Sequence, residues 1–418
     1  MNKNISSENH ISRKNELYTV IRTTPNIKMA ALSVLVHVGS RHEPNNIFGI
    51  SHLLEHMVFK GTKNRTQKEI AYTIENIGGK MNAYTGKEYT VYHVALLPEY
   101  IQTGINIIGD IVMNPLLNTG LELEKGVVVE EIYQTLNTPC DLVYDYAYSS
   151  VFAKDPMGHS IAGTKESVMA MTVNDLQSYH SQYYCKNNIF VSVVGNVQAD
   201  HVEQMLQTTF GAMPKQLIQP SPLTQYQCHG CGIINDNINQ QYVIISYPCG
   251  IMDERQEMTM QLFSYIIGRG FSSRLFQEVR EKRGLVYDIH VGVSQYTDCG
   301  LFYVYICSST EKVKEAIIVT KDILSNSIGS IIEEELMRAK AQIKTSLANM
   351  FDSAISMCDS MVHSMAFLGH PLEVTEKIMI LETITLSDIE RLILQILKTQ
   401  PSLATVGPLD NTDLYCLI

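Results

Sequence analysis

The chain has 418 residues, of which 45% are hydrophobic and 18% are charged. This balance excludes a disordered chain and a long coiled coil, and the length predicts two or three domains with a sizeable core. Lysine and arginine number 32 against 43 aspartates and glutamates, a formal net charge of −11. The negative surplus argues against a protein that binds nucleic acid by neutralising phosphates, and fits one that attracts basic partners.

The N-terminal stretch, residues 1–16, is polar and mixes basic with acidic side chains. It lacks the apolar core of a secretory signal and the acid-poor composition of a transit peptide. No run in the chain reaches the ~18 consecutive apolar residues of a membrane span. We therefore expect a cytoplasmic protein with no membrane partner.

Strand and helix patterns alternate along the chain. Residues 31–38 and 90–96 are rich in β-branched side chains, which predicts two strands. Between them, residues 67–77 carry apolar side chains at helical spacing, and Gly78 and Gly79 form a stop signal. Residues 213–227 contain three prolines and no clear periodicity, which predicts a linker near the midpoint.

The two sides of this linker repeat one another. A helix start at residues 171–176 leads to a strand that ends near Gly195, and a similar start at residues 384–389 leads to a strand that ends near Gly407. The strands at 32–38 and 90–95 correspond to residues 242–247 and 302–306. We predict an α+β fold of two homologous domains, 1–215 and 228–418, joined by a linker at 216–227. Chance similarity between common patterns is the alternative.

Nine cysteines are scattered irregularly, and their odd number indicates reduced thiols instead of a disulfide framework. Cys228 and Cys231 form one C-x-x-C pair. No second ligand pair for zinc lies nearby, and residues 232–234 resemble a loop and a strand, not the helix of a thioredoxin-like motif. The spacing favours coincidence, and the role of the pair stays open.

The sharpest chemical signal is His52-Leu53-Leu54-Glu55-His56, in an apolar helical run over residues 50–59 with Ser51 as a plausible N-cap. Histidines four residues apart share one helix face, so both imidazoles can reach one metal ion. Glu55 is close enough to reach a water molecule on that metal. The order H-x-x-E-H is the reverse of the H-E-x-x-H metalloprotease motif.

A catalytic zinc ion usually has three protein ligands and a water molecule. The carboxylate-rich helical stretch at residues 121–132 contains Glu131, 75 residues beyond His56, and Glu124 two turns earlier on the same face. Lone histidines in apolar helices are usually core residues, and acidic helices are usually solvated. However, three buried polar groups without a metal or partner would each cost about 1–3 kcal/mol or more, which favours a metal site.

Four segments resemble pitrilysin-family metallopeptidases (inverzincins), in the branch of the mitochondrial processing peptidase β-subunit and its bacterial relatives. Residues 39–43 and 49–62 resemble the active-site segment, and residues 78–85 resemble the substrate-binding edge strand. Residues 124–132 resemble the distal glutamate segment, whose register makes Glu131 the ligand and not Glu130. Residues 272–287 are similar to the C-terminal signature, although Arg269 interrupts a commonly all-glycine run.

This resemblance implies two α/β-sandwich domains with mostly antiparallel sheets and one Zn²⁺ per chain. It implies that His52, His56 and Glu131 hold the metal, that Glu55 is the general base, and that Arg280 and Tyr287 hold the substrate. Asn82, Ala83, Tyr84 and Thr85 would form the peptide-binding strand edge. Glu124 and Asp141 could orient the histidines by hydrogen bonds, although a plain surface role for Asp141 is as plausible. The second copy of the repeat places Gln261, Ser264 and Tyr265 opposite the motif, so it carries no metal ligands.

The resemblance also implies a zinc endopeptidase that cleaves unfolded peptides in a closed chamber, and the net charge favours basic, presequence-like ones. Because larger relatives close two such pairs of domains around the peptide, we expect a homodimer. Two alternatives are a non-catalytic assembly subunit with the same fold and a catalytic subunit that needs an α-type partner. The four intact motif residues His52, Glu55, His56 and Glu131 favour the enzyme.

A homodimer that shares its sites predicts complementation between two inactive variants. If Arg280 and Tyr287 of one subunit serve the zinc site of the other, mixing Glu55→Gln chains with Tyr287→Phe chains restores peptide cleavage, because one site of each mixed dimer is intact. The measurement is hydrolysis of a quenched peptide before and after subunit exchange. A mixture no more active than its components contradicts sharing between subunits.

Overall fold

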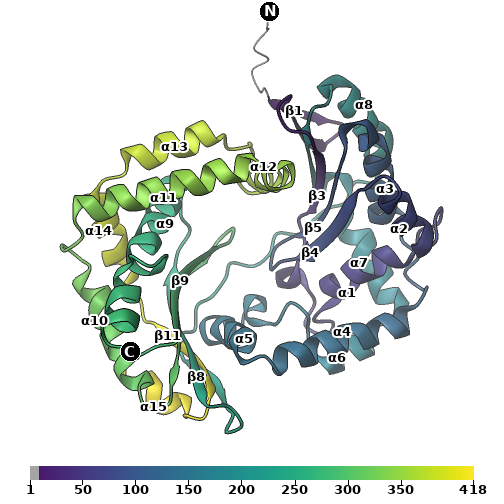
Figure 1. Cartoon of the computed structure of the whole chain (residues 1–418). Helices are drawn as coiled ribbons and strands as arrows, with labels where there is room; N and C mark the ends of the chain where they lie inside the picture. The colour runs from purple at the N-terminus through teal and green to yellow at the C-terminus, as the bar shows by residue number, and fades with distance from the viewer. Residues whose placement is uncertain (1–8) are drawn as a thin grey trace, which may run out of the picture. The chain divides into compact units, whose positions relative to one another are not determined.

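The computed structural model describes residues 9–418, in two compact units that each contain one β-sheet (Figure 1). Unit 1 comprises the chain up to Ile132 together with residues 160–221 and 348–372, and unit 2 comprises residues 133–159, 222–347 and 373–418. The first eight residues of the polar N-terminal stretch lie outside the described part. Within residues 9–418, no helix combines the length and hydropathy that crossing a bilayer requires.

The sheet of unit 1 has six strands in the order β1-β2-β6-β3-β5-β4. β2 and β6 are parallel, and the other neighbouring strands are antiparallel. Among the described strands β4 pairs only with β5, so it forms an edge of this sheet. The strands are β1 Asn9–Lys14, β2 Leu17–Thr23, β3 Ala30–Val36, β4 Lys80–Thr85, β5 Thr90–Leu96 and β6 Ile189–Gly195.

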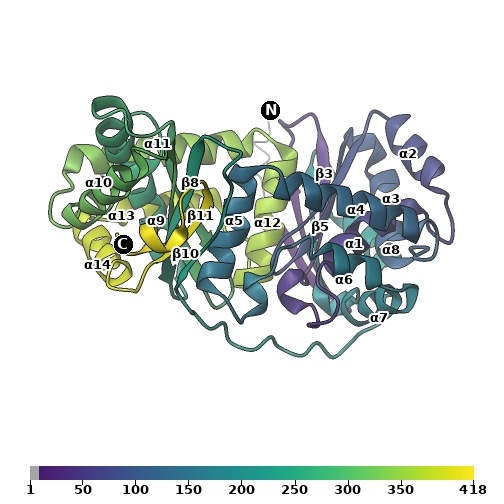
Figure 2. The same ribbon diagram turned by 90° about the horizontal axis from the view of Figure 1, so that it is seen from below.

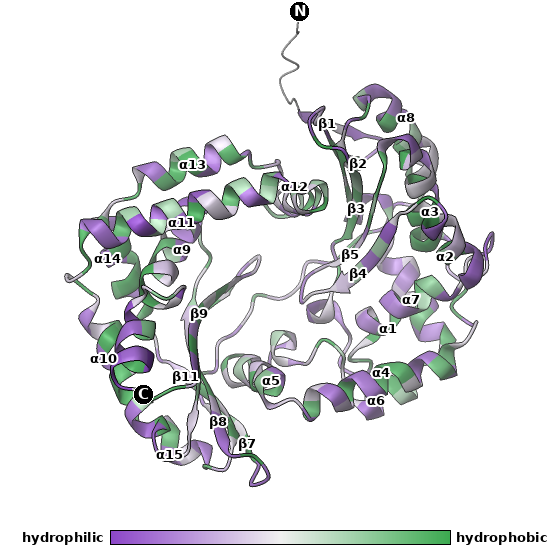
Figure 3. Cartoon of the chain, viewed as in Figure 1, coloured by the Kyte–Doolittle hydropathy of each residue, from purple (hydrophilic) through white to green (hydrophobic). Residues whose placement is uncertain are grey.

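Helices cover both faces of this sheet, which explains why every residue of β3 is buried. Leu32 and Val34 belong to the main core with residues of α1 and the largely hydrophobic α3, green in Figure 3. Ala31 and Leu35 pack on the other face against α12, from the second half of the sequence. The helices of unit 1 are α1 Ile50–Met57, α2 Gln67–Glu75, α3 Ile101–Met113, most of α4 Leu121–Leu136, α6 Lys165–Ala170, α7 Val173–Tyr183, α8 Ala199–Phe210 and α12 Ala354–Leu368.

The sheet of unit 2 repeats this topology in the order β7-β11-β8-β10-β9, again with one parallel pair, β7 and β11. Its order matches β2-β6-β3-β5-β4 of unit 1, and β9 takes the edge position of β4. The predicted α+β class and internal repeat are confirmed. The strands are β7 Gly230–Ile234, β8 Gln240–Cys249, β9 Asp288–Gln295, β10 Gly300–Ser309 and β11 Ser402–Gly407.

In unit 2 the second face of the sheet is covered by α5, from the first half of the sequence, whose Leu142, Val143 and Ala147 pack on Ile244 of β8. Each unit thus takes one covering helix from the other half of the chain, an exchange that the predicted contiguous domains do not include. The helices of unit 2 are α5 Pro139–Val151, α9 Glu254–Gly268, η6 Phe276–Lys282, α10 Val313–Asn326, most of α11 Glu333–Phe351, α13 Val374–Thr383, α14 Leu386–Ile396 and α15 Asn411–Tyr415.

The start of α1 differs from the prediction, because Gly49 and not Ser51 is the N-cap. Gly49 has a φ of 90°, and a Cβ atom there would lie 2.4 Å from the carbonyl oxygen of Ala162. Glu43 supplies the cap that glycine lacks, since its carboxylate accepts hydrogen bonds from the backbone N–H of Gly49 at 2.7 Å and of Ser51 at 2.9 Å. Burial raises the pKa of Glu43 to about 7, and these hydrogen bonds oppose the rise.

Replacing Gly49 by alanine is expected to lower the free energy of unfolding by about 1–3 kcal/mol, because it adds a close contact to left-handed backbone strain. Gly120→Ala is the matched control, since Gly120 has a φ of 74° but no atom within 4 Å of the new Cβ. The measurement is urea unfolding followed by circular dichroism. Equal losses in the two variants would show that the approach to Ala162 does not constrain this turn.

Candidate metal centre

Helix α1 presents His52 and His56 side by side, with their ring centroids 4.7 Å apart. Between and beside them Leu53, Leu54 and Met57 are fully buried in the core of unit 1. The four-residue spacing places both imidazoles on one face, as the sequence predicts, while the leucines hold the other side of the helix against the core.

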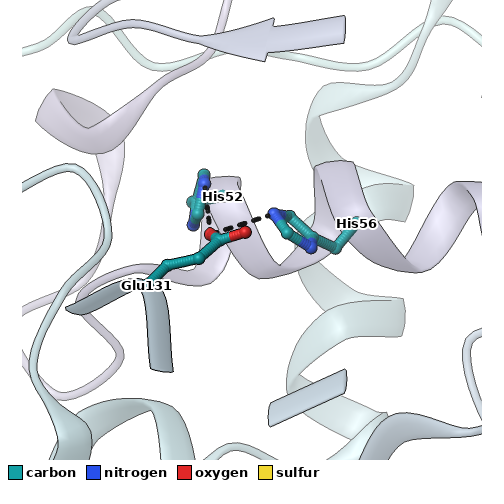
Figure 4. Close-up of side chains that lie close together, drawn as sticks. All are labelled: His52, His56 and Glu131. Atoms are coloured by element: carbon teal, nitrogen blue, oxygen red, sulfur yellow. Dashed lines mark ion pairs between the residues drawn. The ribbon is translucent and has the colours of Figure 1, made fainter. Parts of the chain in front are cut away.

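Helix α4 brings Glu131 to the two histidines, as Figure 4 shows. One carboxylate oxygen of Glu131 lies 3.7 Å from Nε2 of His52 and 3.5 Å from Nε2 of His56. One ligand atom from each of the three residues falls within 4.8 Å of the others, the only such group of histidine, cysteine and acidic side chains among residues 9–418. The neighbouring Glu130 is exposed, so the helix register selects Glu131.

The chemistry of these atoms fits a zinc ion. Burial, with a smaller contribution from His56, lowers the pKa of His52 to about 4, so the imidazole is neutral at pH 7 and can act as a ligand. Its Nδ1 is buried and has no hydrogen-bond partner among the described residues. Two imidazole nitrogens and one carboxylate oxygen form a common donor set of catalytic zinc sites with an open fourth position.

A hydrogen bond orients His56 from behind. Its Nδ1 lies 3.0 Å from Oε1 of Glu124, and Oε2 of Glu124 forms an ion pair with Nζ of Lys60 at 2.5 Å. Glu124 is buried, with only 4% of its side chain exposed. Because the carboxylate engages Nδ1, Nε2 is the ring nitrogen that faces Glu131. A hydrogen-bonding partner on one ring nitrogen fixes the tautomer and orientation of a metal-binding histidine in this way.

Glu55 is held by the edge strand β4. The hydroxyl of Thr85 donates a hydrogen bond to Oε2 of Glu55 over 2.5 Å. Burial raises the pKa of Glu55, and the hydrogen bond from Thr85 opposes this rise. A carboxylate with a raised pKa is the kind of group that can exchange a proton near neutral pH.

The predicted peptide-binding residues line this same strand. Asn82 is exposed at the edge, Ala83 packs against the main core, and Tyr84 is half-buried with its hydroxyl 3.0 Å from Nε2 of His363. Their role in binding a peptide stays a prediction.

Other predicted site residues belong to unit 2. Arg280 lies in η6 with its guanidinium 4.7 Å from the ring centroid of Phe276, and it lines a cavity of about 430 Å³. Tyr287 precedes β9 and is 73% exposed, and Asp141 is exposed in the first turn of α5. Their predicted roles in holding the substrate and orienting the histidines stay untested. Gln261, Ser264 and Tyr265 lie on α9.

Sequence reasoning missed three contacts that support the site: the Glu43 cap of α1, the Lys60 partner of Glu124, and the hydrogen bond from Thr85 to Glu55. Lys60 stands four residues after His56, so helical spacing could have placed it on the same side. The other two contacts join separate elements and leave no local signal.

Replacing Glu124 by glutamine is expected to weaken Zn²⁺ binding about 10- to 100-fold, because His56 loses a charged partner while the side-chain shape is kept. Glu130→Gln, an exposed change on the same helix, is the control and is expected to bind as the original chain does. The measurement is competition with a chelator of known affinity. Unchanged affinity in Glu124→Gln would show that Glu124 does not support the ligand.

Comparisons with known proteins agree with this geometry. Residues 18–165 match the family model described as insulinase (peptidase family M16), and residues 170–343 match the model of the peptidase M16 inactive domain. A protein of Rickettsia felis named as an uncharacterized zinc protease is 32% identical over 95% of this chain and 97% of its own length. One of Streptomyces coelicolor with the same description is 29% identical over 94% of this chain and 88% of its own.

The fold is also found in solved structures. A protease from Helicobacter pylori superposes with a TM-score of 0.87 at 23% identity, covering 96% of this chain and 100% of that one. A peptidase M16 inactive domain from Pseudomonas fluorescens gives 0.89 at 18% identity, covering 96% and 98%. The family models and the Rickettsia relative cover both halves of the sequence, so this chain belongs to peptidase family M16, the insulinase or pitrilysin family, whose bacterial zinc proteases it resembles along nearly its whole length.

Proposed function

We propose that this chain is a zinc-dependent endopeptidase that hydrolyses extended, unfolded peptides. The observation that carries the proposal is the meeting of His52, His56 and Glu131 beside Glu55, a carboxylate outside the ligand group. A non-catalytic subunit of the same fold would need neither the three converging side chains nor a separate acid held next to them.

The residues divide the work of peptide hydrolysis. His52, His56 and Glu131 would hold Zn²⁺, which when bound polarises a peptide carbonyl and makes water more acidic. Glu55, with its raised pKa, is suited to accept a proton from the attacking water and to deliver it to the leaving nitrogen. Thr85 fixes the position of that carboxylate through its hydrogen bond.

The edge position of β4 supports binding of the substrate as an added strand. β4 uses only one of its two hydrogen-bonding edges, with β5, among the described strands. An extended peptide beside Asn82 and Ala83 could bind through main-chain hydrogen bonds, which implies a loose sequence preference. The net charge of −11 supports a preference for basic peptides.

The remaining parts of the proposal rest on the family resemblance. Arg280 and Tyr287 would hold the peptide, in the same chain or in the second copy of a homodimer. A requirement for a separate α-type partner would appear as a chain that binds zinc but cleaves only after that partner is added.

Replacing Glu55 by glutamine is expected to lower kcat about 10²- to 10⁴-fold while zinc content stays near one ion per chain, since the change removes a proton acceptor and no ligand. Hydrolysis of a quenched basic peptide and elemental analysis are the two measurements. Glu130→Gln serves as the control, and a chelator is expected to abolish cleavage until zinc is restored. Zinc well below one per chain, together with cleavage that ignores the chelator, would contradict the proposed function.

A further inference from the structure

Strand β4 is attached to the rest of unit 1 on both of its faces by side chains that alternate in direction. Neighbouring residues of a strand point to opposite sides of the sheet. Tyr84 points to the face that α12 covers, and Thr85 points to the face that α1 covers. The two residues are paired with Val91 and Thr90 of β5, at the end of the strand nearest the turn.

On the α12 face, Tyr84 lies in an aromatic cluster. Its hydroxyl is 3.0 Å from Nε2 of His363, and the ring of His363 stands edge-on to Tyr89 at a centroid distance of 4.3 Å. The ring of Tyr84 is also 6.1 Å from that of His93 and 6.2 Å from that of Tyr89. The aromatic cluster thus surrounds the hydroxyl of Tyr84, although β4 is an edge strand.

Helix α12 is itself held firmly on the sheet, so His363 is a fixed point. Ser33 of β3 donates a hydrogen bond to Asp359 at 2.5 Å, and the thiol of Cys358 donates to the carbonyl of Ser192 at 3.0 Å. Met357 and Met361 pack with Val20 and Val194 in a separate small core. Figure 2 shows α12 beside β3 and β5, with which it is in contact.

On the opposite face, the hydroxyl of Thr85 reaches Oε2 of Glu55 at 2.5 Å. Thr85 therefore links the end of β4 to the proton acceptor proposed for the reaction. Ala83, two residues before Thr85 in β4, packs against the main core. β4 is thus attached to α12 through Tyr84 and to Glu55 of α1 through Thr85.

We propose that His363 of α12 is a positioning residue for peptide binding, acting through the hydroxyl of Tyr84 on strand β4, and that Thr85 is a positioning residue for Glu55. The inference rests on the proposed peptidase function and adds to it a separate role for each of the two contacts. The Tyr84 tether sets how well the strand edge binds an extended peptide, and the Thr85 tether sets the orientation of the proton acceptor.

The two tethers predict that substitutions at two adjacent residues change different kinetic constants. Tyr84→Phe and His363→Phe are expected to raise KM for an extended peptide about three- to tenfold with kcat nearly unchanged, the loss from one hydrogen bond. Thr85→Val is expected to lower kcat about ten- to a hundredfold with KM nearly unchanged, since a misplaced group reacts poorly. Thr85→Ser, which keeps the hydroxyl, is expected to restore most of kcat.

Two controls separate the tether from general loosening. Thr19→Ala removes a buried hydrogen bond from β2 to Glu203 of α8, which involves neither α12 nor β4, so it is expected to lower stability and leave KM unchanged. Tyr72→Phe, at an exposed position on α2, is expected to be silent. If Thr19→Ala raises KM as much as Tyr84→Phe does, or if the Tyr84 and Thr85 variants change the same kinetic constant, the proposal is wrong.

Hydrogen exchange of the metal-free full chain tests the Tyr84 tether without any cleavage. Tyr84→Phe and His363→Phe are expected to speed exchange of the β4 amides bonded to β5 by the three- to tenfold that one lost hydrogen bond allows, with β3 and β6 unchanged. Unchanged exchange in β4 overturns the inference even if peptides are cleaved. An inactive original chain with faster β4 exchange in the variants would instead reject the proposed function and keep the tether.

Discussion

The site depends on a short helix that must be apolar on one side and carry two imidazoles on the other. Eight residues cannot form a stable helix alone in water, so α1 exists because the core of unit 1 holds it. Burying side chains such as Leu53 and Leu54 contributes about 1.5–3 kcal/mol each. That gain offsets the cost of withdrawing His52 and His56 from water. The helical backbone then fixes the distance between the two imidazoles.

Charge is distributed around this helix so that each buried acid has a partner. Glu124 has Lys60 and His56, Glu55 has Thr85, and Glu43 has the backbone N–H groups at the start of α1. Glu131 differs from these acids, since 43% of its side chain is exposed and its Oε2 lies near both imidazoles. A cation at the proposed metal site would supply the counter-charge for this carboxylate.

Comparison of the two units separates the features that the fold requires from those that the metal site requires. Their sheets share strand order and the single parallel pair, so the fold does not require a metal. The second copy carries Gln261, Ser264 and Tyr265 on the helix that corresponds to α1, and the described residues of unit 2 contain no metal-ligand group. Each sheet also needs cover on its second face, and the exchange of α5 and α12 supplies it.

Local pattern was sufficient for features that depend on one element or on a repeated one. The sequence alone determined that His52 and His56 share a face, that residues 67–77 form a helix, observed as α2 Gln67–Glu75, and that the chain repeats itself. These features depend on helical and strand periodicity, which neighbouring residues carry. Only the tertiary structure decided that Gly49 caps α1 with the help of Glu43, and that α12 covers the first sheet. The contacts of Tyr84 with His363 and of Ser33 with Asp359 join residues 279 and 326 positions apart, and such pairings follow from the packing of whole layers, which no local periodicity encodes.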